Sequence, residues 1–218
     1  MPSAVRWALL DGVPEEEVRR LLSVARRRKF ERGEIVFHEH DPADTLHLIV
    51  KGHFIVRTQT QLGDRAILAV LGSGEMFGEL ALLGDDDARR SATIAALEPG
   101  ETYSVHKIDF DALRRDHPDT AQVVISILSG QVRRLSRHLL EALYVPADKR
   151  VLRRLNEIAA LYDDGVVPLT QEDLASLAGT SRATVNRVLR EEEARGTIKL
   201  GRGRTSVLDA TEIARRGG

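Results

Sequence analysis

The segment Phe77-Gly78-Glu79-Leu80-Ala81-Leu82 is followed by Arg90-Ser91-Ala92, with Arg90 eleven positions after Glu79. Arginine presents a planar set of N–H donors that suits a phosphate, and backbone N–H groups with a serine hydroxyl complete such a site. A carboxylate such as Glu79 accepts a hydrogen bond from a ribose hydroxyl but repels a free phosphate. The pairing therefore indicates a ligand that carries both groups, such as a ribose cyclic phosphate.

Short apolar runs separated by turns surround this segment, from residue 34 to residue 104. Strands are predicted over 35–37, 46–50, 54–56 and 67–71, with turns at Asp41-Pro42, Lys51-Gly52, Leu62-Gly63-Asp64 and Gly72-Ser73-Gly74. Many short strands favour a barrel or a sandwich. Before them, Pro14 and three glutamates predict the start of a helix over 13–28.

A long helix is predicted from Ala121 onward. Its apolar or small residues recur with spacings that alternate between four and three, at Ala121, Ile125, Leu128, Val132, Leu135, Leu139 and Ala142. A seam of about three heptads is typical of a two-stranded coiled coil, so these residues are the predicted homodimer interface. Packing of the helix on its own barrel is the alternative. Pro146 interrupts the pattern and marks a hinge.

The chain beyond Pro146 changes to short helices. Helices are predicted over 149–161, from Thr170 and from Ser181, and β-like runs over 198–200 and 206–208. Thr170 with Asp173 three residues later resembles a capping box, and Gly179-Thr180 is the turn before the helix capped by Ser181. The order helix, tight turn, helix and hairpin predicts a winged helix-turn-helix.

The third of these helices is predicted to enter the major groove of double-stranded DNA. Arginine to guanine is the commonest specific base contact, and Arg182 and Arg187 lie on its exposed side. The predicted DNA-contacting residues are Thr170, Ser181, Arg182, Ala183, Thr184, Arg187, Lys199, Arg202 and Arg204. Residues 176–206 hold seven basic and three acidic side chains, whereas the whole chain has a net charge of −1. A solvated basic face is the alternative.

Composition excludes several classes of protein. A chain of 218 residues suffices for two modest domains, and the absence of cysteine excludes disulfides, thiolate zinc sites and iron–sulfur clusters. No apolar run approaches the roughly 20 residues that span a bilayer, and the start lacks the pattern of a signal peptide. We therefore expect a cytoplasmic protein. No catalytic motif and no nucleotide-hydrolysing loop appears, so no enzyme is predicted.

The quoted segment resembles a known family. Phe77-Gly78-Glu79-Leu80 with Arg90-Ser91-Ala92 is similar to the phosphate-binding cassette of cyclic-nucleotide-binding domains. With the heptad helix and the helix-turn-helix, the chain resembles the cyclic-AMP receptor protein/fumarate-nitrate regulator (CRP/FNR) family of bacterial transcription regulators from about Val13 to Leu208. The resemblance implies an α+β fold, with an N-terminal β-roll (double-stranded β-helix or jelly-roll) sensor domain over 1–117, a dimerisation helix over 118–145 and a winged helix-turn-helix domain over 146–218.

The resemblance also implies roles for single residues. The predicted ligand-binding residues are Gly78, Glu79, Leu80, Arg90, Ser91, Ala92, Leu135 and Ser136. Glu79 would accept from the ribose and Arg90 with Ser91 would hold the cyclic phosphate. The family's base-contacting Thr-Ser pair falls on Leu135-Ser136, and an arginine of the same helix falls on Gln131. These two replacements remove polar contacts from the base pocket, which weakens the case for cyclic AMP itself more than for a cyclic phosphate.

Other departures bear on ligand and operator. The run Asp85-Asp86-Asp87 places acid in the cassette loop, Ala183 replaces a glutamate that reads cytosine, and Glu192 and Thr197 replace leucines, which predicts looser packing. No metal site is expected at His38, His40 and His47, which lie at a strand end and turn that the family uses without metal.

The leading hypothesis is a homodimeric regulator that binds an inverted-repeat operator under the control of a cyclic nucleotide, cyclic AMP first, with no obligatory cofactor. A ligand-independent regulator with a degenerate barrel, or one with another ligand, is the alternative. Family analogy adds RNA polymerase as a partner through Asp163-Asp164-Gly165.

Overall fold

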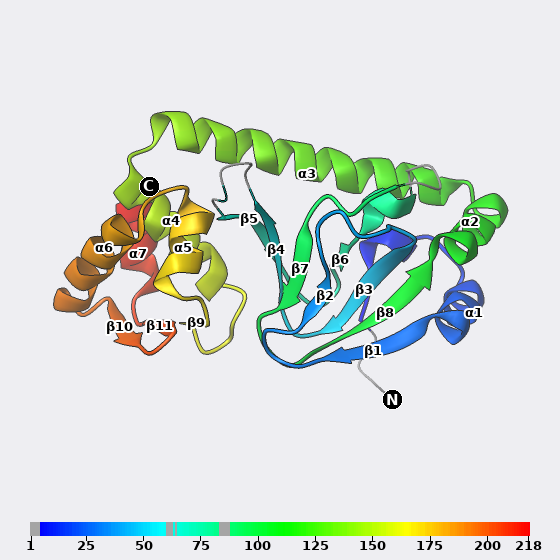
Figure 1. The fold of residues 1–218 in the computed structure, drawn as a ribbon, viewed down its shortest axis with the longest axis horizontal. Coiled ribbons are helices and arrows are strands. Elements are labelled where there is room, and N and C mark those ends of the chain that lie inside the picture. Colours follow the sequence, from blue (N-terminus) through cyan, green and yellow to red (C-terminus); the bar gives the residue numbers. More distant parts are fainter. Residues whose placement is uncertain (1–4, 60–62, 64, 83–87) are drawn as a thin grey trace. The chain divides into compact units, whose positions relative to one another are not determined.

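The computed structural model describes residues 5–59, 63, 65–82 and 88–218 (Figure 1). The chain divides into two compact units, one made of residues 1–58 and 69–133 and the other of residues 59–68 and 134–218. The boundary falls within α3 (Asp119–Tyr144), the long helix predicted from Ala121.

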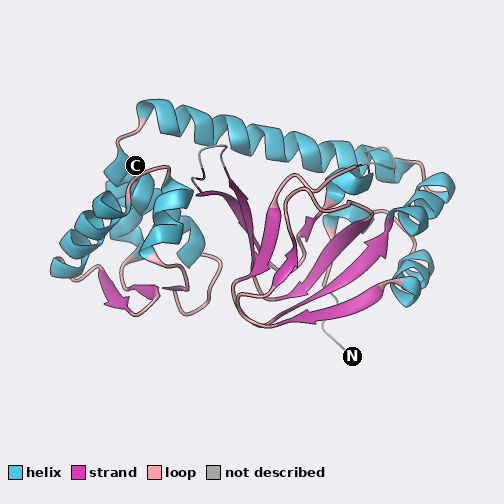
Figure 2. Cartoon of the chain, in the orientation of Figure 1, coloured by secondary structure: helices cyan, strands magenta, loops and turns pink. Residues whose placement is uncertain are grey.

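Two four-stranded sheets lie between Arg26 and His106. One has the order β1 (Arg26–Phe30), β8 (Gly100–His106), β3 (Thr45–Lys51), β6 (Met76–Phe77), and the other β2 (Ile35–Phe37), β7 (Thr93–Ala96), β4 (Phe54–Gln59), β5 (Arg65–Leu71) (Figure 2). Antiparallel ladders join β1 to β8, β8 to β3 and β3 to β6, and in the second sheet β2 to β7 and β7 to β4. All four predicted strands are confirmed, and the α+β fold with a β-roll is confirmed with them.

Strand β3 explains where the core lies. Successive side chains of a strand point to opposite faces. Leu46 and Leu48 join a cluster that includes residues of α1 (Glu15–Val24) and α2 (Lys107–Asp116), whereas Ile49 packs between the sheets with Phe54 and Phe77. Because both faces are covered, the strand is a continuous apolar run, and His47 is its one buried polar member.

The predicted helix over 13–28 is wrong at its end. Helix α1 stops at Val24, and Arg26–Phe30 forms β1 against β8, with Arg26 opposite Ser104 and Phe30 opposite Gly100. Arginine and lysine have good helix propensity, but pairing with a distant strand overrides it here. Exposed charges are common on an edge strand, where they discourage pairing with other chains.

The C-terminal unit is a winged helix-turn-helix, as predicted. Its helices are α4 (Ala147–Ala159), α5 (Gln171–Ala178), α6 (Arg182–Ala194) and α7 (Ala210–Gly217), and its sheet has the order β10 (Ile198–Gly201), β11 (Arg204–Val207), β9 (Val166–Val167). The capping box is present, since Thr170 Oγ1 accepts from the Asp173 N–H at 3.0 Å. Ser181 Oγ caps α6 by accepting from the Thr184 N–H at 3.1 Å. Gly179, at φ +60°, ends α5.

Among the described residues, no helix is both long enough and apolar enough to cross a bilayer.

Candidate functional site

The Arg90 side chain points into the β-roll. It is 5% exposed, and its Nη1 and Nη2 donate to the carbonyl and the Oγ1 of Thr45, both at 2.6 Å. The guanidinium also lies 4.1 Å from the centre of the Phe37 ring. The backbone on either side is fixed, since Arg90 N donates to Asp41 O and His40 N donates to Arg90 O, each at 2.9 Å. Arg89 is exposed, so Arg90 is the inward arginine of the pair.

The Arg90 guanidinium keeps spare hydrogen-bonding capacity. Its Nε is buried and has no partner among the residues that the structure describes. The nearest carboxylate contact is with Asp44, at 3.9 Å. Burial lowers the pKa of Arg90, while Asp44, Asp41 and Glu79 act in the opposite direction. A buried N–H without a partner is rare in folded proteins, so this cation suits an anionic acceptor.

Gly78 lies directly behind this arginine. Its φ of +80° is one that side-chain-bearing residues rarely adopt, and a Cβ there would lie 2.8 Å from Arg90 Nη1 and 2.9 Å from Thr45 O. Only glycine therefore combines this positive φ with the space that Arg90 and Thr45 occupy. The next residues begin the short helix η2 (Glu79–Leu82), on which Leu80 is exposed.

Glu79 connects the cassette to α3. The side chain is buried, and its Oε1 accepts from Gln131 Nε2 at 3.0 Å. The sequence identified Gln131 only as a lost arginine, but the structure shows that the amide keeps a polar link to the carboxylate. Thr45 and Phe37 are site residues that sequence reasoning missed, since neither belongs to the quoted motif.

The other predicted ligand-binding residues differ in exposure. Ala92 is buried, Ser91 is exposed beside it, and Leu135 and Ser136 are exposed on α3. The acidic run 85–87 lies outside the described residues.

His47 is the buried polar residue of the β-roll. Burial, with smaller contributions from the charges of Arg90 and Arg28, lowers its pKa to about 3. The ring stacks on Phe77 with centroids 4.9 Å apart, and its Nδ1 lies 3.1 Å from Thr102 Oγ1. His47 is therefore neutral near pH 7. Among the described residues, no group of three or more histidine and acidic side chains has the arrangement of a metal site.

Helix α6 has the exposed face that DNA binding requires. Ser181, Arg182 and Ala183 are exposed at its start, whereas Val185 and Val188 are buried. On the wing, the exposed basic residues are Lys199, Arg202 and Arg204. The Thr170 hydroxyl is engaged in its capping box and donates to Asp173 Oδ2 at 2.7 Å.

Arg187 is the recognition-helix residue whose surroundings the sequence did not reveal. Its Nη2 donates to Asp148 Oδ1 of α4 at 2.5 Å, and its Nη1 donates to Glu191 Oε1 at 3.0 Å. Arg182, by contrast, has no polar partner in the described part of the chain.

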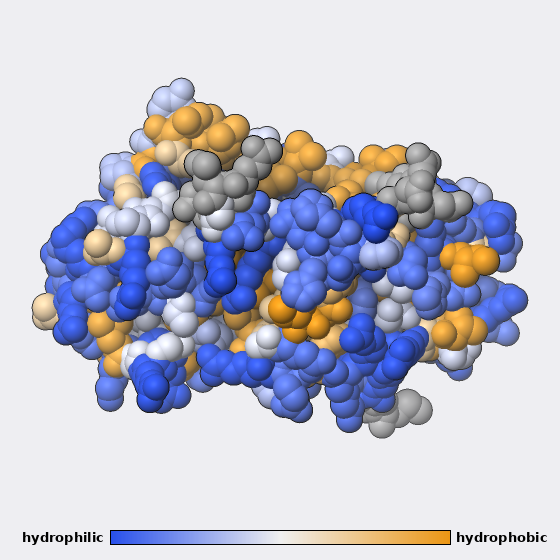
Figure 3. Space-filling view, viewed as in Figure 1, coloured by the Kyte–Doolittle hydropathy of each residue, from blue (hydrophilic) through white to orange (hydrophobic). Residues whose placement is uncertain are grey.

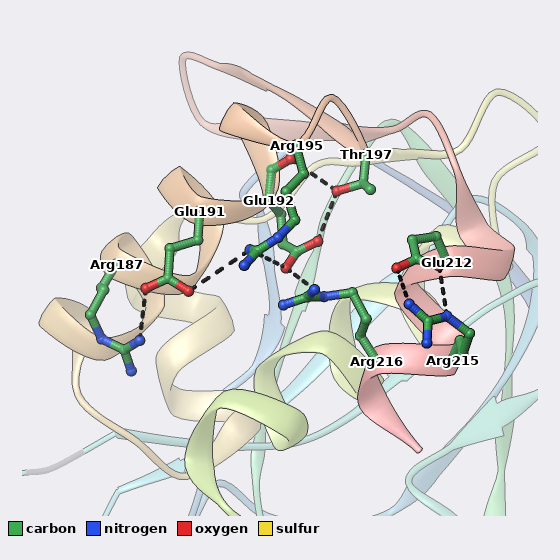
Figure 4. Close-up of polar contacts among 8 residues, drawn as sticks. All are labelled: Arg187, Glu191, Glu192, Arg195, Thr197, Glu212, Arg215 and Arg216. Atoms are coloured by element: carbon green, nitrogen blue, oxygen red, sulfur yellow. Dashed lines mark hydrogen bonds and ion pairs between the residues drawn. The ribbon is translucent and has the colours of Figure 1, made fainter.

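Glu192 and Thr197 complement each other. Both are buried, and the Glu192 carboxylate accepts from Thr197 Oγ1 and from Arg195 Nη1, with Arg216 of α7 also within ion-pair distance (Figure 4). The prediction of looser packing considered the two residues separately and missed this bond. Glu193 is also engaged, since its Oε1 accepts from the Leu200 N–H of the wing at 2.9 Å.

Comparison with known proteins identifies the family. Residues 27–117 match the family described as "Cyclic nucleotide-binding domain", and residues 133–216 match "Crp-like helix-turn-helix domain". The "Cyclic AMP receptor protein" of Thermus thermophilus is 35% identical over 205 residues, which cover 93% of each chain.

The chain belongs to the CRP/FNR family.

Further comparisons agree with this membership. The "CRP-like cAMP-activated global transcriptional regulator" of Mycobacterium tuberculosis is 29% identical, over 97% of this chain and 96% of that one. The solved structure of the cyclic di-GMP-responsive global regulator CLP of Xanthomonas campestris is 21% identical, with a TM-score of 0.75 over 89% of this chain and 99% of that chain, which supports the fold. As a CRP/FNR protein, the chain is a DNA-binding transcription regulator with a cyclic-nucleotide-binding domain, and its family is not one of enzymes.

Proposed function

We propose that this regulator is controlled by a cyclic nucleotide bound in the N-terminal β-roll, with cyclic AMP as the first candidate. The observation that carries the proposal is the buried Arg90 guanidinium, held by Thr45, whose Nε has no partner among the described residues. An anionic cyclic phosphate supplies the missing acceptor. The names of two relatives, from Thermus thermophilus and Mycobacterium tuberculosis, refer to cyclic AMP.

The proposed contacts follow from the chemistry of each residue. Arg90 and Ser91 hold the cyclic phosphate, and Glu79 accepts from the ribose 2′-hydroxyl. Gly78 and Leu80 contribute backbone groups beside Ala92, and Leu135 with Ser136 faces the base. Glu79 already accepts from Gln131, which supports a carboxylate that is oriented before the ligand arrives.

We also propose that two copies pair along α3. The seam residues Ile125, Val132, Leu135 and Leu139 are each more than half exposed, whereas Leu128 packs partly against its own core. Figure 3 shows apolar side chains gathered over α3 along the top of the view. Such an apolar stripe is costly to leave in water, and a second copy of the same helix covers it.

In this proposal, residues 1–117 sense the ligand, 118–145 form the dimerisation helix, and 146–218 bind an inverted-repeat operator. The DNA contacts are those predicted for α5, α6 and the wing, in which arginines read bases and hydroxyls hold phosphates. Contact with RNA polymerase and a cytoplasmic location stay predictions.

Calorimetric titration with cyclic AMP, cyclic GMP and cyclic di-GMP tests the effector. We expect one of them to bind the wild type with a micromolar or lower dissociation constant, and Arg90→Ala to lose that binding. Arg89→Ala removes the same charge from the exposed neighbouring residue, and this variant should still bind the nucleotide. Circular dichroism of both variants checks that they fold.

The proposal would be wrong if none of the three nucleotides bound to protein that is folded and still binds selected DNA. The protein would then be a ligand-independent regulator whose β-roll serves only as a scaffold.

A further inference from the structure

Two carboxylates hold Arg187, the recognition-helix arginine assigned above to DNA contact. The Asp148 oxygen lies 2.5 Å from Nη2 and the Glu191 oxygen 3.0 Å from Nη1. Figure 4 shows the contact with Glu191, one turn further along α6. Asp148 comes from a different helix, α4. All three side chains are about half exposed, so the cluster is open to an approaching ligand.

Asp148 is held in place by the local fold. It lies in the first turn of α4, two residues after Pro146, where the helix dipole favours a carboxylate. Two residues later, Arg150 donates to the carbonyls of Val145, Ala178 and Gly179, which ties the start of α4 to the end of α5. The backbone that carries Asp148 is therefore tied to α5, which keeps the carboxylate within reach of Arg187.

The charges at this point oppose DNA binding. One guanidinium faces two carboxylates, so the cluster carries a net charge of −1 where the phosphates of a duplex would approach. Arg187 already uses one N–H of each terminal nitrogen on a carboxylate. A base or phosphate that takes either of those N–H groups must displace that carboxylate, and a displaced Asp148 stays behind as an unpaired negative charge. Arg182, on the same helix, has no such partner in the described residues and meets no such cost.

We propose that Asp148 competes with DNA for Arg187 and thereby limits the affinity of this regulator for DNA. The inference rests on the proposed role of Arg187 as a DNA contact. An exposed ion pair contributes little to stability, so the restraint is moderate and a well-matched operator overcomes it. The pair also raises the pKa of Arg187, through hydrogen bonds to Asp148 and then Glu191, which agrees with a cation held in its charged form.

Fluorescence anisotropy with a labelled operator duplex, obtained by binding-site selection, tests the proposal on the full chain. We expect Asp148→Asn to bind about two- to five-fold more tightly than the wild type, the range that an exposed ion pair corresponds to. Glu172→Gln is the matched control, because it removes one charge from the first turn of α5 without touching Arg187. The gain from Asp148→Asn should exceed the gain from this control.

A double-mutant cycle separates the inference from the function on which it rests. Arg187→Ala should weaken binding, and in that background Asp148→Asn should gain no more than the Glu172→Gln control does. If Arg187→Ala leaves binding unchanged, both the DNA contact and the inference are wrong. If Arg187→Ala weakens binding but Asp148→Asn weakens it too or merely equals the control, the contact stands and the competition is overturned. Asp148→Ser removes the same charge with a different side chain and should give the same gain in affinity. Thermal unfolding of each variant checks that it is folded.

Discussion

Thr197 Oγ1 donates to Glu192 Oε2 at 2.9 Å, and both side chains are buried where α6 meets the wing. A buried carboxylate is costly unless it is paired and hydrogen-bonded. Here Arg195 and Arg216 approach Oε1 at 3.2 and 3.0 Å, so that α6, the start of the wing and α7 share one carboxylate (Figure 4). This cluster fixes the end of the recognition helix within its own unit.

Glu192→Ala should therefore destabilise the C-terminal unit. The loss should be about 2 kcal/mol, below the roughly 3–5 kcal/mol of a fully buried pair, because the Arg195 and Arg216 side chains are 44% and 30% exposed and regain water. Urea unfolding followed by circular dichroism measures it. The double variant Glu192→Leu with Thr197→Leu replaces both partners by apolar groups and should lose much less. Equal losses in the two variants would mean that the hydrogen bond contributes nothing.

Gly78→Ala should abolish nucleotide binding, because the new methyl group displaces the Arg90 guanidinium from Thr45. Gly33 provides the control, since its φ of +82° is nearly the same and a Cβ there meets nothing within 4 Å. Both variants should lose about 1–2 kcal/mol of stability from the backbone conformation. Gly78→Ala should lose more, because its Cβ also lies 2.9 Å from the Thr45 carbonyl oxygen, and only this variant should lose the ligand in calorimetry. Normal binding by Gly78→Ala would argue against Arg90 as the phosphate contact.

The stability of the N-terminal unit should fall as the pH is lowered. The pKa of His47 is about 3 in the folded protein, whereas an unfolded histidine has a value of about 6.5. Between these values the unfolded chain binds a proton that the folded chain does not, so acid favours unfolding. Each pH unit in this window costs about 1.4 kcal/mol for one such group.

The comparison of wild type with His47→Gln isolates this effect. The wild type should lose about 2 kcal/mol more than the variant between roughly pH 6.5 and pH 4.5, as measured by urea unfolding at each pH. His138, whose pKa is also lowered, first by burial and then by Arg154, is present in both proteins and cancels in the difference. Parallel pH profiles would show that His47 is not neutral and buried in solution.

Under the proposed pairing along α3, Leu139→Lys should convert dimers into monomers. It places two charges opposite each other in the seam, in place of an apolar side chain that is 61% exposed in the single chain. Sedimentation equilibrium should show a dissociation constant raised at least about ten-fold. Ser126→Lys, also exposed on α3 but outside the seam, adds the same charge and should leave the dimer intact. Dimers in both variants would place the interface elsewhere.

The sequence alone determined the features that depend on residue type and short spacing. The Thr170–Asp173 capping box, the Ser181 cap and the long helix from Ala121 are encoded within a few neighbouring residues, because caps and helical periodicity are local. The same holds for the cassette motif and for the family resemblance that it carries.

Only the tertiary structure decided which distant residues meet. Arg26–Phe30 became a strand because β8, 70 to 78 residues away along the chain, pairs with it. The contacts of Glu79 with Gln131, Arg90 with Thr45, and Arg187 with Asp148 join residues 52, 45 and 39 positions apart. No local pattern encodes these partners, since each arises from packing between elements whose hydrophobic faces bring the polar groups together. The charge balance around both proposed binding sites is therefore a property of the fold, even though the motifs themselves are readable in the chain.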